Sequence, residues 1–129
     1  MQVLLDSHCL IWAMDDPARL GPTARATLVH RGNRLVVSIA TVWEVAIKVA
    51  NGRLPLSLPY RSWMEAAVKD LELAVLPITL DHAEQQTRLA FHHRDPFDRL
   101  IAAQAIEEGL PLVSADTIFD AYGVPRIWK

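Results

Sequence analysis

The chain alternates short apolar runs with longer segments in which apolar residues recur at helical spacing. The apolar runs cover residues 3–5, 35–37, 74–78 and 112–114. Unbroken runs of this length are typical of strands that are buried on both faces of a parallel sheet. The pattern therefore predicts an α/β fold with a central parallel sheet of four to five strands.

The segments between these runs are bounded by proline, glycine and short polar residues. Gly21 and Pro22 open one helix, and Asp95 followed by Pro96 is a favourable start for another, which the sequence Gly109-Leu110-Pro111 ends. Pro77 interrupts the third apolar run and favours an edge position for that strand. The predicted helices cover residues 7–14, 22–30, 39–50, 60–71, a segment beginning at Asp81, and 96–108.

The overall composition fits one globular unit. The chain has 129 residues, of which 51% are hydrophobic and 22% are charged, so we expect a single domain over residues 1–129 with one core. The apolar stretches fall short of the roughly 18 residues that a membrane helix needs, and we see no cleavable leader. These features predict a soluble, cytoplasmic protein.

Four acidic residues, although far apart in the sequence, are predicted to meet at one edge of the sheet. Asp6 ends the first strand, Glu44 lies on the first turns of the helix after the second strand, and Asp116 follows the last strand. Asp98 lies on the first turn of a helix that leads into that strand, and a right-handed crossover places this turn at the same edge. Clustered carboxylates repel one another unless cations bind, so the four acids predict a site for a hard metal ion.

Other potential metal ligands are scarce. Cys9 is the only cysteine, which agrees with a reducing compartment and excludes a structural zinc site built from thiolates. His92 and His93 are adjacent, so their side chains diverge, and we expect them to face the surface or the substrate. Oxygen ligands alone favour Mg²⁺ or Mn²⁺ over zinc.

Each of the four acids also has a purely structural interpretation. Asp6 could cap the helix that follows it, and Asp116 could cap a short helix after the last strand. Asp98, at the third helical position, could interact with the helix dipole. These interpretations are independent of one another and do not predict that the acids converge.

Glu44 has a structural alternative of its own. With Thr41 it matches a capping box, and with Lys48 it forms an i,i+4 pair. Asp81 and Glu84 match the same capping pattern at the start of the next helix, and we assign these two acids no catalytic role.

The net charge of −2 gives no overall attraction to nucleic acid. A polyanion would have to be held by a local basic patch, or by metal ions that first neutralise the acids. Each basic side chain could equally be a solvated surface charge. The candidates for contacting a phosphate backbone are Arg99, Arg94, Lys48 and Arg53.

Several segments of the chain, in this order and spacing, carry a family resemblance. They are LLDSHCLIW, SIATVWEVAIKVANGRL, HHRDPFDRLIAAQA, LVSAD and the terminal YGVPRIW. Together they resemble PIN-domain ribonucleases, and in particular the VapC-like toxins of bacterial and archaeal toxin–antitoxin pairs. The resemblance implies a doubly wound sheet with helices on both faces and a Mg²⁺- or Mn²⁺-dependent endoribonuclease that hydrolyses RNA with metal-activated water.

The resemblance also implies roles for individual residues. Asp6 and Asp98 would be the principal metal ligands, Glu44 would complete the acidic pocket directly or through water, and Asp116 would be the fourth acid. Ser114 would orient a ligand or the substrate phosphate. Asp95 would contact the metal ligands and not the metal itself.

Partners are implied in the same way. VapC-like proteins form homodimers and are inhibited by a cognate antitoxin, which binds along the groove with an extended or helical segment. The chain offers four aromatic side chains as possible anchors for such contacts, Trp12, Trp43, Trp63 and Trp128.

Two other classes of protein share some of these features. A phosphoacceptor receiver domain has a similar length and a parallel sheet, but it needs paired acids after the first strand, where this chain has Asp6 followed by Ser7. A non-catalytic binding module could keep the PIN fold and use its groove for protein partners. Metal-dependent RNA cleavage separates the enzyme from both alternatives.

Overall fold

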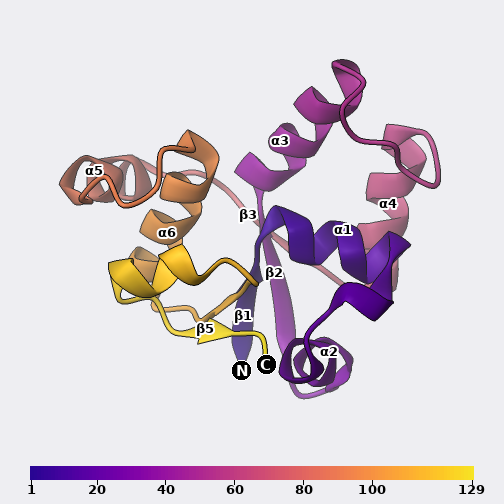
Figure 1. The fold of residues 1–129 in the computed structure, drawn as a ribbon, viewed down its shortest axis with the longest axis horizontal. Coiled ribbons are helices and arrows are strands. Elements are labelled where there is room, and N and C mark those ends of the chain that lie inside the picture. The colour runs from indigo at the N-terminus through magenta and orange to yellow at the C-terminus, as the bar shows by residue number, and fades with distance from the viewer.

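A five-stranded parallel sheet forms the centre of the computed structural model, which describes residues 1–129 (Figure 1). The strand order β3-β2-β1-β4-β5 is that of a doubly wound sheet, with β1 in the middle. The strands are β1 (Gln2–Leu5), β2 (Arg34–Ser38), β3 (Ala74–Leu76), β4 (Leu112–Val113) and β5 (Arg126–Ile127). The predicted α/β class and parallel sheet are confirmed.

Helices fill the connections between the strands and cover both faces of the sheet (Figure 1). Two short 3₁₀ helices, η1 (Pro17–Arg19) and η2 (Thr117–Tyr122), complete the chain. The α-helices are α1 (Ser7–Asp15), α2 (Pro22–Val29), α3 (Ile39–Ala50), α4 (Tyr60–Asp70), α5 (Leu80–Arg88) and α6 (Pro96–Glu108).

The two faces of the sheet carry separate cores because successive strand residues point to opposite sides. Val3 and Leu5 of β1 pack in a cluster that contains Trp63 of α4, together with residues of α1 and α2. Leu4 points the other way, into a cluster that contains Ile101 of α6 and Phe119 of η2. All six side chains are almost completely buried, so the strands that carry the candidate site are fixed from both sides.

Several predicted boundaries are confirmed. Asp95 caps α6 by accepting the Phe97 N–H, Pro96 is the first helical residue, and Gly109 ends the helix with a φ of 65°. The strand before Pro77 lies at the edge of the sheet, paired only with β2. The terminal strand β5 was not among the four apolar runs, since it consists of only Arg126 and Ile127.

The predicted capping boxes are wrong in both helices. α3 begins at Ile39, directly after β2, and the Ser38 hydroxyl caps it, so Glu44 lies on the second turn and beyond capping distance. α5 begins at Leu80 and is capped by Thr79, whose backbone N–H in turn donates to the His82 ring. In each case a hydroxyl nearer the strand end takes the cap.

Candidate metal centre

Three strands end side by side at the edge of the sheet where the acids were expected. Leu5, the last residue of β1, pairs with Val37 on one side and Val113 on the other. The residues that follow Leu5 and Val113 are Asp6 and Ser114, and both side chains are buried. Asp6 therefore lies at the centre of the carboxyl edge, where open α/β sheets bind ligands.

Asp6 is held by two donors. Its Oδ1 accepts the Cys9 backbone N–H at 2.8 Å, which makes it the cap of α1, and its Oδ2 accepts the Ser114 hydroxyl. Burial nevertheless raises the pKa of Asp6, against the two hydrogen bonds that lower it. The capping alternative is thus correct for this residue, but capping does not offset the desolvation of its charge.

Ser114 links Asp6 to Asp116. While its hydroxyl donates to Asp6, its oxygen accepts the Asp116 backbone N–H at 3.0 Å. Asp116 caps η2 through Oδ1, which accepts the Ile118 N–H, as the structural alternative predicted. Its second oxygen, Oδ2, remains directed toward the acidic edge, so capping and a site role are compatible in the same side chain.

Asp98 lies on the first turn of α6, with 21% of its side chain exposed. Its pKa is raised to about 7, first by burial and then by the nearby charges of Asp95, Glu44 and Asp6, while His93 opposes the shift. These charges come from separate elements of the chain. The predicted convergence of the acids is therefore visible in the electrostatics of Asp98.

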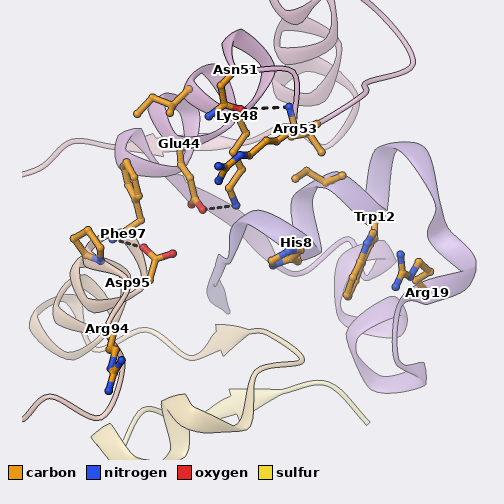
Figure 2. Close-up of a pocket in the computed structure, with 14 residues that line it drawn as sticks. His8, Trp12, Arg19, Glu44, Lys48, Asn51, Arg53, Arg94, Asp95 and Phe97 are labelled. Carbon is orange, nitrogen blue, oxygen red and sulfur yellow. Dashed lines mark hydrogen bonds and ion pairs between the residues drawn. The ribbon is translucent and has the colours of Figure 1, made fainter.

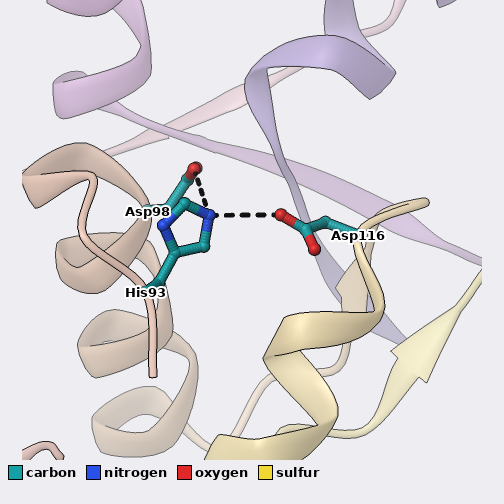
Figure 3. A group of neighbouring side chains, drawn as sticks. All are labelled: His93, Asp98 and Asp116. Atoms are coloured by element: carbon teal, nitrogen blue, oxygen red, sulfur yellow. Dashed lines mark hydrogen bonds and ion pairs between the residues drawn. The ribbon is translucent and has the colours of Figure 1, made fainter. Parts of the chain in front are cut away.

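His93 is part of the site, which the sequence did not predict. Its Nε2 lies 3.0 Å from Asp98 Oδ2 and 3.2 Å from Asp116 Oδ2, so the ring joins the two carboxylates (Figure 3). The two adjacent histidines do diverge, as expected: His92 packs edge-on against Tyr122, with ring centroids 5.0 Å apart, while His93 turns inward. Which of the two would face the acids depends on the path of the loop before α6.

Glu44 is buried in α3 and pairs with Lys48, whose Nζ lies 2.9 Å from Oε2 (Figure 2). The predicted i,i+4 pair is therefore present. Thr41, one turn earlier on the same helix, is also buried, and its hydroxyl has no hydrogen-bond partner. Glu44 contributes its charge to the surroundings of Asp98, although its own nearest contact is a lysine.

A groove with a volume of about 790 Å³ runs from Glu44 across the molecule (Figure 2). Its lining combines positive charges with apolar side chains from α1, α3 and the loops around them. Among the lining residues are the basic Arg19, Lys48, Arg53 and Arg94 and the apolar Ile11, Trp12, Ile47, Leu54 and Phe97. Three of the four predicted phosphate-binding residues thus line one groove beside the acidic edge.

Arg99 is the fourth, and it does not face the groove. Its guanidinium donates to the backbone carbonyls of Gln86, Leu89 and Ala90, at the C-terminal end of α5 and just beyond it. The side chain is buried and lies over the Phe91 ring, at 4.0 Å from the centroid. Its predicted substrate role is not supported, because its donors are engaged in holding α5 against α6.

The tryptophans differ in whether a partner protein could reach them. Trp63 is fully buried in the core, so it offers no anchor to a partner. Trp12 lines the groove and packs near Trp128, with ring centroids 5.8 Å apart. Trp43 is 62% exposed on α3 and packs edge-on against Phe97.

The donor set of the site fits a hard divalent cation. Its members are carboxylates from β1, α3, α6 and the residues after β4, and oxygen ligands suit Mg²⁺ or Mn²⁺. Ligand atoms of His93, Asp98 and Asp116 lie within 4.8 Å of one another. Burial and then the neighbouring acids raise the pKa of Asp98, so a bound cation would favour its ionised form and offset both effects.

Comparison with known proteins decides the family. The sequence profile of the PIN domain matches residues 3–125. This chain belongs to the PIN-domain family. It is 33% identical to ribonuclease VapC22 of Mycobacterium tuberculosis (strain ATCC 25618 / H37Rv) over 125 residues, which is 96% of this chain and 94% of that protein. The resemblance to VapC-like proteins that the sequence indicated is confirmed.

Solved structures of VapC-type complexes share the fold. VapBC2 from Rickettsia felis, solved bound to a DNA fragment from the promoter of its genes, matches with a TM-score of 0.78 and 16% identity over the whole of both chains. VapBC-5 from M. tuberculosis matches with a TM-score of 0.64 and 23% identity over 98% of this chain and 97% of that one. At these identities the likeness shows a shared fold.

Proposed function

We propose that this PIN-domain protein is a Mg²⁺- or Mn²⁺-dependent endoribonuclease that acts as the toxin of a toxin–antitoxin pair. The observation that carries the proposal is the convergence of Asp6, Glu44, Asp98 and Asp116 at the carboxyl edge of the sheet, beside a basic groove. The relationship to a protein named as a ribonuclease supports the same activity.

The residues that would hold the metal are Asp98 and Asp116, with Asp6 and Glu44 completing the negative charge around it. A bound divalent cation lowers the pKa of water and stabilises the charge that develops on a phosphodiester. Ser114 is a positioning residue, because its hydroxyl fixes Asp6 and receives the backbone N–H of Asp116. Asp95, the cap of α6, fixes the turn that carries Asp98.

Water is the nucleophile that this site supports. Burial raises the pKa of the Cys9 thiol, which keeps it protonated and unreactive. The Ser114 hydroxyl donates a hydrogen bond to Asp6, but it is fully buried and bridges two acids, so it is poorly placed to attack a substrate. We propose that water forms the new P–O bond while the bond from phosphorus to the 3′ oxygen breaks, which leaves a 5′-phosphate and a 3′-hydroxyl on the RNA products.

The groove would bind the RNA. Arg53 and Arg94 are exposed along its lining, and Lys48 lines it while paired with Glu44. Positive side chains at these positions can hold consecutive phosphates and direct one of them to the acidic edge. We propose that single-stranded RNA is the substrate, since phosphate contacts need no duplex geometry.

Cleavage assays with purified, antitoxin-free protein test this function. A labelled single-stranded RNA is incubated with the metal-free protein, with and without millimolar Mg²⁺ or Mn²⁺, and the product ends are analysed. We expect cleavage only with metal, and products with 5′-phosphates. Cleavage in chelator that leaves 2′,3′-cyclic phosphates would contradict the mechanism, and intact RNA in all conditions would favour the non-catalytic binding module.

The apolar part of the groove is suited to an antitoxin segment. Trp12, Ile47 and Phe97 line the same groove as the basic residues, so a bound protein segment would exclude RNA. The solved relatives include complexes of VapB and VapC proteins. We propose that a cognate antitoxin binds here and inhibits cleavage in the cytoplasm, and adding that protein should stop the RNA assay.

Self-association is the remaining partner interaction that we propose. Ile39 and Trp43 lie one turn apart on α3 and are 39% and 62% exposed. An exposed apolar stripe of this kind suits contact with a second copy of the chain. Light scattering should therefore give the mass of a homodimer for the wild type and a smaller apparent mass for Trp43→Glu.

A further inference from the structure

The two nitrogens of the His93 ring have different partners. Nδ1 accepts the backbone N–H of Asp95 at 3.1 Å, while Nε2 faces Asp98 and Asp116. A backbone N–H can only donate, so Nδ1 uses its lone pair in this bond and the neutral ring carries its hydrogen on Nε2. Nε2 is therefore a hydrogen-bond donor to both carboxylates and has no lone pair to offer to a metal ion.

The N–H of His93 and a metal ion would need the same two oxygen atoms. Nε2 lies 3.0 Å from Asp98 Oδ2 and 3.2 Å from Asp116 Oδ2, which are typical distances for hydrogen bonds. The potential ligand atoms of the three residues lie within 4.8 Å of one another, close to the span of about 4.2 Å across an octahedral Mg²⁺. A cation that binds both carboxylates here must displace the ring.

The backbone around His93 is anchored separately from its side chain, which is partly exposed to solvent. The His93 backbone N–H donates to the Tyr122 hydroxyl at 2.9 Å, which fixes the main chain beside η2. The side chain is 20% exposed, and its ring packs loosely on Phe119, with centroids 6.2 Å apart. Rotation about the side-chain bonds can thus move the ring toward solvent while the loop stays in place.

We propose that His93 occupies the position of the metal in the metal-free protein and leaves it when the ion binds. This inference rests on the proposed metal site. It makes His93 a positioning residue that holds Asp98 and Asp116 together and lowers their repulsion until a cation arrives. On the other side of the acidic edge, the Lys48 ammonium pairs with Glu44 at 2.9 Å, so side chains of the protein itself contact the acids on both sides.

The inference predicts the direction in which a mutation changes metal affinity. If His93 competes with the ion, His93→Ala should tighten binding by about 3- to 10-fold, because the two hydrogen bonds no longer have to be broken. If His93 were instead a ligand, its loss should weaken binding by about 10-fold or more. His93→Gln can still donate an N–H and should lie between the wild type and His93→Ala.

Titration with Mn²⁺, followed by the loss of the free-ion electron paramagnetic resonance signal, measures this directly. The samples are the metal-free wild type, His93→Ala, His93→Gln and the control His92→Ala, whose ring faces Tyr122 and should leave the affinity unchanged. Tighter binding by His93→Ala alone supports the inference. Equal or weaker binding by His93→Ala overturns it.

A failure of the metal site itself gives a different result. If neither the wild type nor His93→Ala binds Mn²⁺, the proposed metal site fails and this inference fails with it. If the wild type binds, Asp98→Asn does not, and His93→Ala is no tighter, only the role of His93 is wrong.

Nitrogen chemical shifts of the His93 ring provide a test that does not need a mutant. In the metal-free protein, Nε2 should show the shift of a protonated nitrogen. With Mg²⁺ bound, the ring should lose its hydrogen bonds to the two carboxylates, and neither ring nitrogen should show the chemical shift of a nitrogen bound to metal. A switch to a hydrogen on Nδ1 with Nε2 bound to the ion would identify His93 as a ligand and overturn the inference.

Discussion

Two buried or half-buried carboxylates in this protein have opposite surroundings. Asp15, at the end of α1, accepts three hydrogen bonds from neutral donors: the Ser57 backbone N–H, the Ser57 hydroxyl and the Trp63 indole N–H. Asp98, at the start of α6, is surrounded by other acids. Partial burial opposes the ionisation of Asp15, but its hydrogen bonds prevail and lower its pKa, whereas the pKa of Asp98 is raised to about 7.

The difference distinguishes a carboxylate that stabilises the fold, Asp15, from one that belongs to the candidate site, Asp98. Asp15 is satisfied by the fold and holds the loop before α4 against α1, so it has no reason to bind an ion. Asp98 has no such set of neutral donors, and its ring contact is His93, whose Nε2 lies 3.0 Å from Oδ2. Arg99 and Arg94 repeat the contrast among the basic residues, one bound to three carbonyls and the other exposed along the groove.

A large effect that sharpens this comparison is expected at Glu44. Glu44→Gln keeps the size of the side chain and can still accept a hydrogen bond from Lys48, so the free energy of unfolding should fall by less than about 1 kcal/mol. RNA cleavage should fall by about 100-fold or more, because the negative charge around the metal is reduced. A cleavage assay and a thermal melt on the same sample measure both.

Glu65→Gln is the matched control. Glu65 also forms an i,i+4 pair, with Arg61 at 3.5 Å, but its side chain is 66% exposed on α4 and outside the site. Its cleavage rate and melting temperature should match the wild type. If Glu44→Gln were as active as this control, Glu44 would be a structural residue like Asp15.

The two arginines should separate stability from RNA binding. Arg99→Ala leaves three backbone carbonyls without their donor and should lower the free energy of unfolding by about 2 to 4 kcal/mol. Arg94→Ala should leave stability unchanged and weaken RNA binding. The slope of the logarithm of the binding constant against the logarithm of the salt concentration should fall by the amount expected for about one phosphate contact. Urea unfolding and salt-dependent RNA binding distinguish these effects, and an exchange of the two outcomes would reverse the assignment.

Loss of the Asp15 carboxylate should affect folding alone. Asp15→Ala leaves the Trp63 indole N–H without its partner and should cost about 1 to 2 kcal/mol of stability. Asp16→Ala is the control, since Asp16 is exposed and its side chain caps no helix. Cleavage per folded molecule should be normal in both variants, and a specific loss of activity in Asp15→Ala would remove the distinction between the two carboxylates.

The smallest effect is a dependence of stability on pH. In the metal-free folded protein the pKa of Asp98 is about 7, above its ordinary value of 3.8, so between these values the folded state binds more protons than the unfolded chain. The contribution of Asp98 to stability is therefore complete below pH 3.8 and is lost as the pH rises through about 7. At pH 8, metal-free Asp98→Asn should exceed the wild type in stability by on the order of 1 kcal/mol.

Urea unfolding in chelator at several pH values measures this difference. The gap between Asp98→Asn and the wild type should close toward pH 4, and millimolar Mg²⁺ should stabilise the wild type more than the mutant at pH 8. A constant gap across this range would mean that Asp98 titrates normally and is not crowded by other acids.

The general position of the site could be predicted because it follows from topology. Asp6 comes directly after β1 and Asp116 shortly after the end of β4, and right-handed connections leave such residues, with Asp98, at one edge. The structure places them there, joined through Ser114 and His93. Strand order and helix direction were sufficient to predict that these acids lie at the same edge of the sheet.

Details that depend on side-chain direction and loop path could not be predicted in the same way. His93 turns inward because its backbone is held by Tyr122, which is 29 residues away in the sequence. The error at Arg99 was avoidable: adjacent residues on a helix point about 100° apart, so if Asp98 faces the site, Arg99 faces elsewhere. The caps of α3 and α5 depended on where each strand ends, which sequence patterns define poorly.

The most direct test of the central claim is whether the acids act as one catalytic unit. RNA cleavage in saturating Mg²⁺ or Mn²⁺ is measured for Asp6→Asn, Asp98→Asn and the double mutant. Each single change should lower the rate by about 1,000-fold or more, and the double mutant should be no slower than either. Efficient cleavage by Asp98→Asn, or losses that multiply in the double mutant, would contradict a shared metal site.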